Sequence, residues 1–158
     1  TYFDFKKQGV SNKEILLRLN FSSDLVDLVH TKYVNIIESQ DYLKFDKLIC
    51  DYELLKTFSI THEIHLCSMR SNKYNSQIQI ERLDISELFR TISWVQHKTT
   101  LKKVRPVRKI QEIYGSVDYY IGDSDIDEMA SNKNNIKFIK ANRYSSTRNI
   151  NKILMGLL

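Results

Sequence analysis

The sequence predicts an α/β domain, with helices on both faces of a parallel sheet, preceded by a helical region. Residues from about 10 to 57 place apolar side chains at helical spacing and show no strand-like alternation. From about residue 58 onward, short apolar runs of strand length alternate with helical patterns, an order typical of a parallel sheet. We therefore expect two regions, residues 1–57 and residues 58–158, within a chain of 158 residues.

Capping signals mark the helices of the first region. Ser11 and Glu14 have the spacing of a capping box, and Ser22 opens a second helix with a long apolar stripe. A third helix carries apolar side chains from Tyr52 to Phe58. These patterns predict a small helical bundle.

The second region reads as alternating strands and helices. Gly115 is expected to end one of the helices, since glycine is a common helix terminator. The expected strands are 64–68, 91–95, 117–121 and 136–139, and the expected helices are 78–83, 105–114, 125–132 and 149–157. Ligands of such sheets bind at the carboxyl ends of the strands.

Composition limits the classes of function. No apolar run is long enough to span a membrane, and the two cysteines, Cys50 and Cys67, share no metal-ligand spacing. Nothing indicates an oxidising compartment, so we expect a cytoplasmic protein. The net charge of +5 favours an anionic partner. Nucleic acid is an unlikely one, because the basic run from Lys98 to Lys109 has no interleaved aromatic residues.

The strongest local signal is an apolar strand that runs into Gly122 and Asp123, with Asp127 four residues later. We expect Gly122 to allow a sharp turn that places both carboxylates at the end of the strand, where they suit Mg²⁺. A calcium loop is disfavoured by the residues at its later positions. The plainer alternative is that Ser124 or Asp125 caps a helix whose first turn favours acids.

Two other polar groups are expected at the same sheet edge. Ser68 ends the strand at 64–68, and Lys103 precedes the helix at 105–114. A hydroxyl, an ammonium and carboxylates that converge at one edge form a phosphate site. A solvated basic helix start is the plain alternative for Lys103, and Lys102 is the next candidate for an active lysine.

With these motifs the chain resembles the haloacid dehalogenase (HAD) superfamily. The apolar strand ending in Ser68 matches its second motif, Lys103 matches its third, and Gly122 with Asp123 and Asp127 matches its fourth. The resemblance implies a three-layer, Rossmann-like α/β/α core with a helical cap. It also implies a Mg²⁺-dependent phosphatase for a small phosphorylated metabolite.

The resemblance also implies roles for individual residues. Ser68 would bind the phosphoryl group, Lys103 would act in catalysis, and Arg70 and Asn72 would contact the substrate. The metal ligands would be Asp123 and Asp127. Trp94 is expected to serve packing.

The family's nucleophile, the first Asp of an Asp-x-Asp motif on the central strand, has no clear counterpart. The nearest candidate is Asp4, but Lys6 stands where the second Asp belongs. We expect the strand to come from a preceding segment that this sequence lacks, or from a partner chain. Another alternative is an inactive relative that binds a phosphorylated ligand or a partner, and the chain as written is expected to be inactive.

Overall fold

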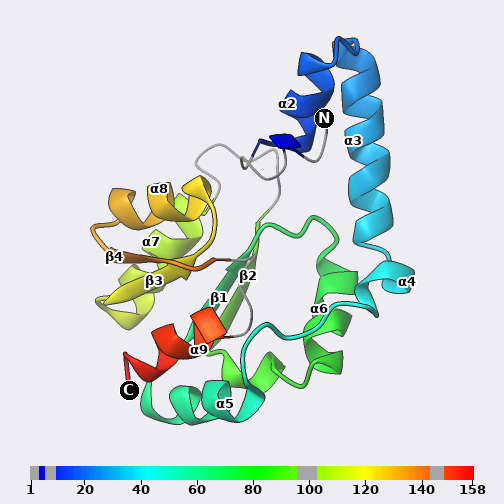
Figure 1. Cartoon of the computed structure of the whole chain (residues 1–158). Helices are drawn as coiled ribbons and strands as arrows, with labels where there is room; N and C mark the ends of the chain where they lie inside the picture. The colour runs from blue at the N-terminus through cyan, green and yellow to red at the C-terminus, as the bar shows by residue number, and fades with distance from the viewer. Residues whose placement is uncertain (1–3, 6–9, 96–102, 143–147) are drawn as a thin grey trace. The chain divides into compact units, whose positions relative to one another are not determined.

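In a computed structural model of the chain, residues 4–5, 10–95, 103–142 and 148–158 are described. The chain divides into two compact units, Thr1–Phe45 and Asp46–Leu158 (Figure 1). No helix in the described ranges is long and apolar enough to cross a membrane.

The first unit is helical, with α2 at Asn12–Arg18, α3 at Ser23–Ile37 and α4 at Gln40–Leu43. The Ser11 and Ser22 side chains cap α2 and α3 by accepting hydrogen bonds from backbone N–H groups three residues ahead, as predicted. α2 packs on α3. The buried apolar side chains of the first unit's described residues are Ile15, Val26 and Leu43.

In the part of the second unit that the structure describes there are four strands, all predicted from the sequence to within a few residues. They are β1 (His65–Ser68), β2 (Thr91–Trp94), β3 (Tyr119–Gly122) and β4 (Lys137–Lys140). Its helices are α5 (Tyr52–Thr61), α6 (Lys73–Arg82), the 3₁₀ turn η1 (Ser86–Leu88), α7 (Val104–Tyr114), α8 (Asp125–Lys133) and α9 (Arg148–Met155). α5, which the sequence analysis assigned to the helical region, lies in this unit.

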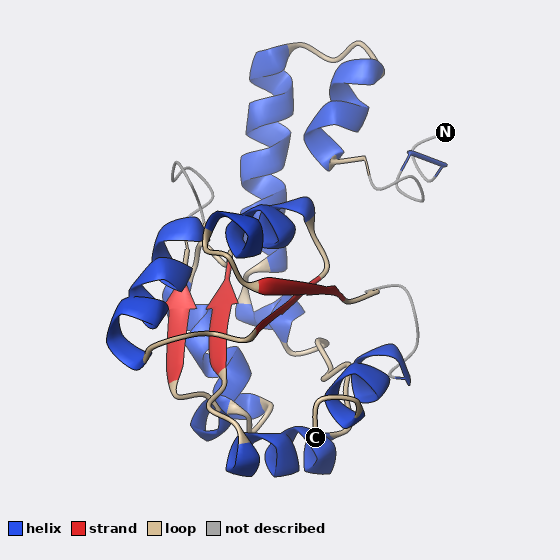
Figure 2. Cartoon of the chain, turned by 90° about the vertical axis from the view of Figure 1, so that its left-hand side faces the viewer, coloured by secondary structure: helices blue, strands red, loops and turns tan. Residues whose placement is uncertain are grey.

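The strands form two parallel pairs. β1 pairs with β2, with His65 opposite Thr91, and β3 pairs with β4, with Tyr119 opposite Lys137. The mixed α/β class and the parallel pairing agree with the sequence prediction. The described strands form two two-stranded sheets (Figure 2), where one continuous sheet was expected.

Apolar burial fixes these elements. A buried cluster joins α5, α6, the start of η1 and α9, and Ile92 and Trp94 of β2 pack against it; its buried members are Leu55, Phe58, Ile80, Ile85 and Leu154. Trp94 thus serves packing, as predicted. A second set of apolar side chains is buried by α7, namely Val104, Val107 and Ile110. α7 also packs on α8. Gly115 ends α7 with a φ of 91°, a conformation that glycine adopts without steric cost.

Candidate functional site

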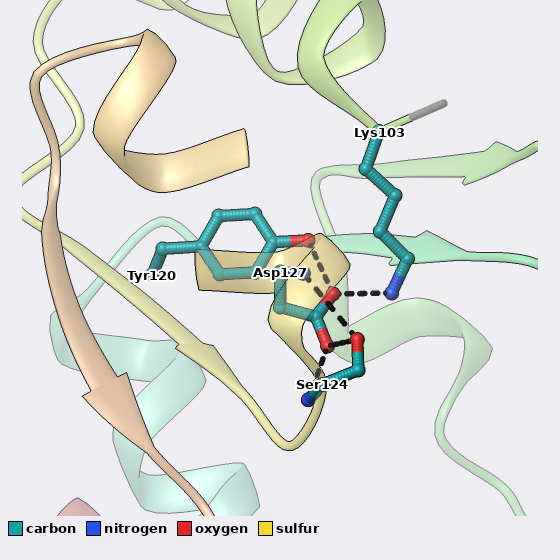
Figure 3. A network of polar contacts seen from close by, with 4 residues as sticks. All are labelled: Lys103, Tyr120, Ser124 and Asp127. Carbon is teal, nitrogen blue, oxygen red and sulfur yellow. Dashed lines mark hydrogen bonds and ion pairs between the residues drawn. The ribbon is translucent and has the colours of Figure 1, made fainter. Parts of the chain in front are cut away.

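The candidate site is built around one buried carboxylate, that of Asp127 in the first turn of α8. Lys103, the residue that precedes α7, donates from Nζ to Asp127 Oδ1 at 2.6 Å (Figure 3). Only 13% of the lysine side chain and 3% of the aspartate side chain are exposed. The ion pair therefore joins the beginnings of two helices that are far apart in the sequence.

Local sequence explains why Asp127 occupies this place. Ser124 and Asp127 form a capping box, in which each side chain accepts a hydrogen bond from the other's backbone N–H group. The Ser124 hydroxyl also donates to Asp127 Oδ2 at 2.6 Å. The plain alternative for this motif, a helix cap by Ser124, is thus confirmed, and the same cap orients the carboxylate toward Lys103.

Gly122 has a different role from the one predicted. Among the glycines of the described ranges only Gly115 has a positive φ, so Gly122 does not serve an unusual turn. A Cβ atom at Gly122 would instead lie 2.6 Å from Asp127 Cγ and 2.8 Å from its Oδ2. The glycine is needed because the Asp127 side chain packs directly on the end of β3.

Two further side chains connect this carboxylate to the strands. The Tyr120 hydroxyl, on β3, donates to Asp127 Oδ1 at 3.1 Å, and it lies near enough to the Cys67 thiol on β1 for the two groups to influence each other's pKa. Burial, reinforced by the nearby Asp127 carboxylate, raises the pKa of Tyr120. Burial likewise raises the pKa of the Cys67 thiol to about 11, although the Lys103 charge opposes the shift. β1, β3, α7 and α8 therefore meet at one group of side chains.

The charge state of Asp127 follows from these contacts. Burial pushes its pKa upward, but the hydrogen bonds and charge of Lys103, together with Ser124, more than offset this and lower the pKa. Four donated bonds reach its two oxygens. A carboxylate has about four lone-pair positions, so Asp127 is a saturated acceptor that holds Lys103 in place.

The end of α8 is also bonded to α7, since Asn134 follows the last residue of α8 and Val104 is the first residue of α7. The buried Asn134 amide donates to Val104 O at 3.1 Å and to Ala130 O at 2.8 Å, while Gln111 donates to the Asn134 carbonyl at 3.2 Å. Because α8 is bonded to α7 through its C-cap as well as through its first turn, the position of Lys103 is set by the fold as well as by its ion pair.

The structure places the other predicted residues as follows. Ser68 is the last residue of β1 and is half-buried; its carbonyl accepts from Val95 N at 2.8 Å. Arg70 pairs with Asp46 at 3.2 Å. Asn72 caps α6 by accepting from Asn75 N at 3.0 Å, a structural role that sequence reasoning had not considered for it.

The predicted metal ligands differ in exposure. Asp123, just past the end of β3, is exposed, whereas Asp127 is buried and engaged by Lys103. Within the described ranges no group of three or more His, Cys, Asp or Glu side chains is arranged to hold a metal ion. Mg²⁺ is commonly bound by one or two carboxylates with waters and substrate phosphate, so Asp123 fits one part of such a site.

Two other candidates lie elsewhere. Asp4 belongs to the first unit, and its neighbours Phe3 and Lys6 are outside the described residues. Lys102, the alternative active lysine, also lies outside them. Among the described lysines, Lys103 is the one that contacts Asp127.

Sequence reasoning missed Tyr120 and Cys67 as members of the site. Both lie in apolar runs and were read as strand or core residues. Their signal was positional, because each lies near the carboxyl end of a predicted parallel strand. Neither a protein-family model nor a characterised protein matches this sequence.

Proposed function

We propose that the second unit is the core of a HAD-like, Mg²⁺-dependent phosphatase that acts on a small phosphorylated metabolite. The observation that carries this proposal is the Lys103–Asp127 ion pair beside Cys67 and Tyr120, near the carboxyl ends of β1 and β3. An ammonium has three donors, and Asp127 uses one of them. Lys103 thus keeps donors for a phosphoryl group where α/β sheets bind ligands.

We further propose that an additional strand lies between β1 and β3 and completes a three-layer core. In the described ranges β1 pairs with β2 only and β3 with β4 only. Neither β1 nor β3 carries a Lys, Arg, Asp or Glu residue of the kind that protects a sheet edge. The Tyr120 hydroxyl of β3 lies near the Cys67 thiol of β1, although the two strands are not paired with each other in the described ranges.

The added strand would come from a segment upstream of Thr1 or from a partner chain, and would end in Asp-x-Asp. Its first carboxylate would attack phosphorus and expel the alcohol, which takes a proton from the second Asp. Water would then hydrolyse the phosphoaspartate and release inorganic phosphate. Lys103 would neutralise charge on the phosphoryl group, and the Ser68 hydroxyl would donate to one of its oxygens.

Mg²⁺ would be held by Asp123 and a carboxylate of the added strand, and would neutralise further charge on the phosphoryl group. Asp127 would contribute indirectly, because its ion pair holds Lys103 in position beside the metal site. The helices of the first unit would act as a cap that selects the substrate. A cytoplasmic location suits both a phosphorylated metabolite and the two free cysteines, Cys50 and Cys67.

A second candidate is a non-catalytic protein that binds a phosphorylated ligand or a partner chain. It is favoured by the engagement of Arg70 with Asp46 and of Asn72 with the start of α6, since both were expected to contact substrate. In this case Lys103 would bind the anion without a nucleophile to attack it.

Hydrolysis of p-nitrophenyl phosphate with Mg²⁺ tests the two candidates. The chain alone is compared with a version extended at its N-terminus by an apolar strand that ends in Asp-x-Asp. Turnover by the extended form, abolished by Lys103→Met, supports the phosphatase. Phosphate binding without turnover by either form supports the binding protein. Neither turnover nor phosphate binding would reject both candidates.

A further inference from the structure

A groove of about 710 Å³ lies along β2 and α7, lined by residues other than those of the Lys103–Asp127 network. β2 contributes Thr91, Ser93 and Trp94, and α7 contributes Arg105 and Lys109. The groove therefore combines a strand, two cations and an aromatic side chain.

One wall of the groove is an edge strand. In the described ranges β2 is hydrogen-bonded to β1 on one side only. Alternate residues of a strand direct their backbone N–H and C=O groups to opposite sides, so the other side of β2 offers a row of such groups. These groups form a regular ladder only with another extended chain.

β2 also lacks the usual protection of an edge. Lys137 and Lys140 are exposed on β4, the edge strand of the other pair, where charged side chains discourage further pairing. β2 has the sequence Thr-Ile-Ser-Trp, without charge or proline. The contrast indicates that the edge of β4 is protected and the edge of β2 is open to pairing.

The opposite wall selects the charge of an occupant. Arg105 and Lys109 are four residues apart on one face of α7, and both are exposed. No ion pair or side-chain hydrogen bond joins either of them to a residue in the described ranges. No Asp or Glu of the described ranges lines the groove, and Ile113, which is 59% exposed, adds an apolar contact.

We propose that this β2–α7 groove binds an extended acidic segment of another protein. The segment adds a strand to the free edge of β2, places carboxylates against Arg105 and Lys109, and packs an apolar side chain on Ile113. Backbone hydrogen bonds supply affinity in such strand addition, and the side-chain contacts supply specificity. The groove is separate from the proposed phosphoryl site, so this binding does not depend on the proposed activity.

Trp94 makes the proposal directly testable, because it is the only tryptophan of the chain and it lines the groove. A peptide of about eight residues that alternates Glu and Val matches the period-two pattern of a strand. We expect it to produce a saturable change in Trp94 fluorescence that weakens with added salt. A Lys-Val peptide should produce none.

Variants of α7 distinguish peptide binding in the groove from general attraction to a basic surface. The double variant Arg105→Gln, Lys109→Gln should lower the affinity for the Glu-Val peptide by about tenfold or more, because both cations are lost. Arg108→Gln removes an exposed cation of the same helix that does not line the groove, and should leave affinity unchanged. Equal loss in both variants would overturn the proposal.

Two probes test the nature of the occupant. A Glu-Val peptide with alternate backbone nitrogens methylated cannot complete a ladder, and we expect it not to bind. Equal binding of the methylated peptide would reject strand addition. If single-stranded oligothymidylate alters the Trp94 signal and the acidic peptide does not, the groove is a nucleic-acid site and the proposal is wrong.

Discussion

Lys103 and Asp127 connect the beginnings of α7 and α8 through an ion pair of 2.6 Å that is almost excluded from solvent. The pair is the centre of a network that reaches β3 through Tyr120 and β1 through Cys67. It therefore fixes four elements of the second unit relative to one another, and its loss affects both stability and any chemistry at this edge.

The first prediction concerns removal of the cation. Lys103→Met leaves the Asp127 carboxylate buried without its counter-charge, so the free energy of unfolding should fall by about 3–5 kcal/mol. Urea denaturation measures this change. Lys133→Met, at an exposed lysine of α8, is the matched control and should cost no more than about 0.5 kcal/mol. A similar loss of free energy of unfolding in both variants would show that Lys103 and Asp127 do not form a buried ion pair.

The second prediction concerns acid. The pKa of Asp127 is lowered below its ordinary value of 3.8, so the folded state binds the proton less readily than the unfolded state does. Stability from Asp127 is therefore fully present well above pH 3.8 and is lost as the pH falls through the lowered value in the folded state. Urea denaturation from pH 6 to pH 2 should show that the free energy of unfolding falls more steeply with decreasing pH for the wild type than for Asp127→Asn. Parallel profiles would contradict the shift.

The third prediction concerns Gly122. A Cβ atom there would overlap the Asp127 side chain, so Gly122→Ala should destabilise the fold by about 1–3 kcal/mol or more. Thermal unfolding provides the measurement. Gly156→Ala is a milder control, since the nearest atom to a Cβ atom there would lie at 3.3 Å. If Gly122→Ala is the better tolerated of the two, Asp127 does not pack against the end of β3.

The fourth prediction uses the Cys67 thiol as a reporter. Its pKa is raised by burial, and the Asp127 carboxylate raises it further, so alkylation by iodoacetamide at pH 8 should be slow. Asp127→Asn removes the negative charge and should accelerate the reaction of Cys67. Peptide mass spectrometry measures this rate, and Cys50 in the same molecule is the internal control because Asp127 does not affect its pKa. An unchanged rate of Cys67 labelling in the variant would show that the Asp127 charge does not affect the pKa of the thiol.

Periodicity located the strands and helices because it depends only on local spacing and burial. It predicted the four strands and the end of α7 at Gly115. It could not predict the separation of the strands into two pairs, because strand neighbours depend on contacts between distant residues. The assignment of α5 failed for the same reason, since a helical pattern does not reveal which core the helix joins.

The candidate site was predicted in part. The spacing of motifs along the chain predicted that Lys103 and Asp127 lie at one sheet edge, and in the structure they are in contact. The Asp46 partner of Arg70 escaped prediction, because an ion pair across 24 residues leaves no local pattern. Tyr120 escaped it because a tyrosine in a strand normally indicates packing.

Titration of inorganic phosphate in the presence of Mg²⁺, followed by isothermal calorimetry, tests the central claim most directly. We predict saturable binding by the wild type, a loss of at least about tenfold in affinity for Lys103→Met, and no change for the exposed control Lys133→Met. Equal affinity in all three proteins, or no binding by the wild type, would contradict a phosphoryl site at the Lys103–Asp127 pair.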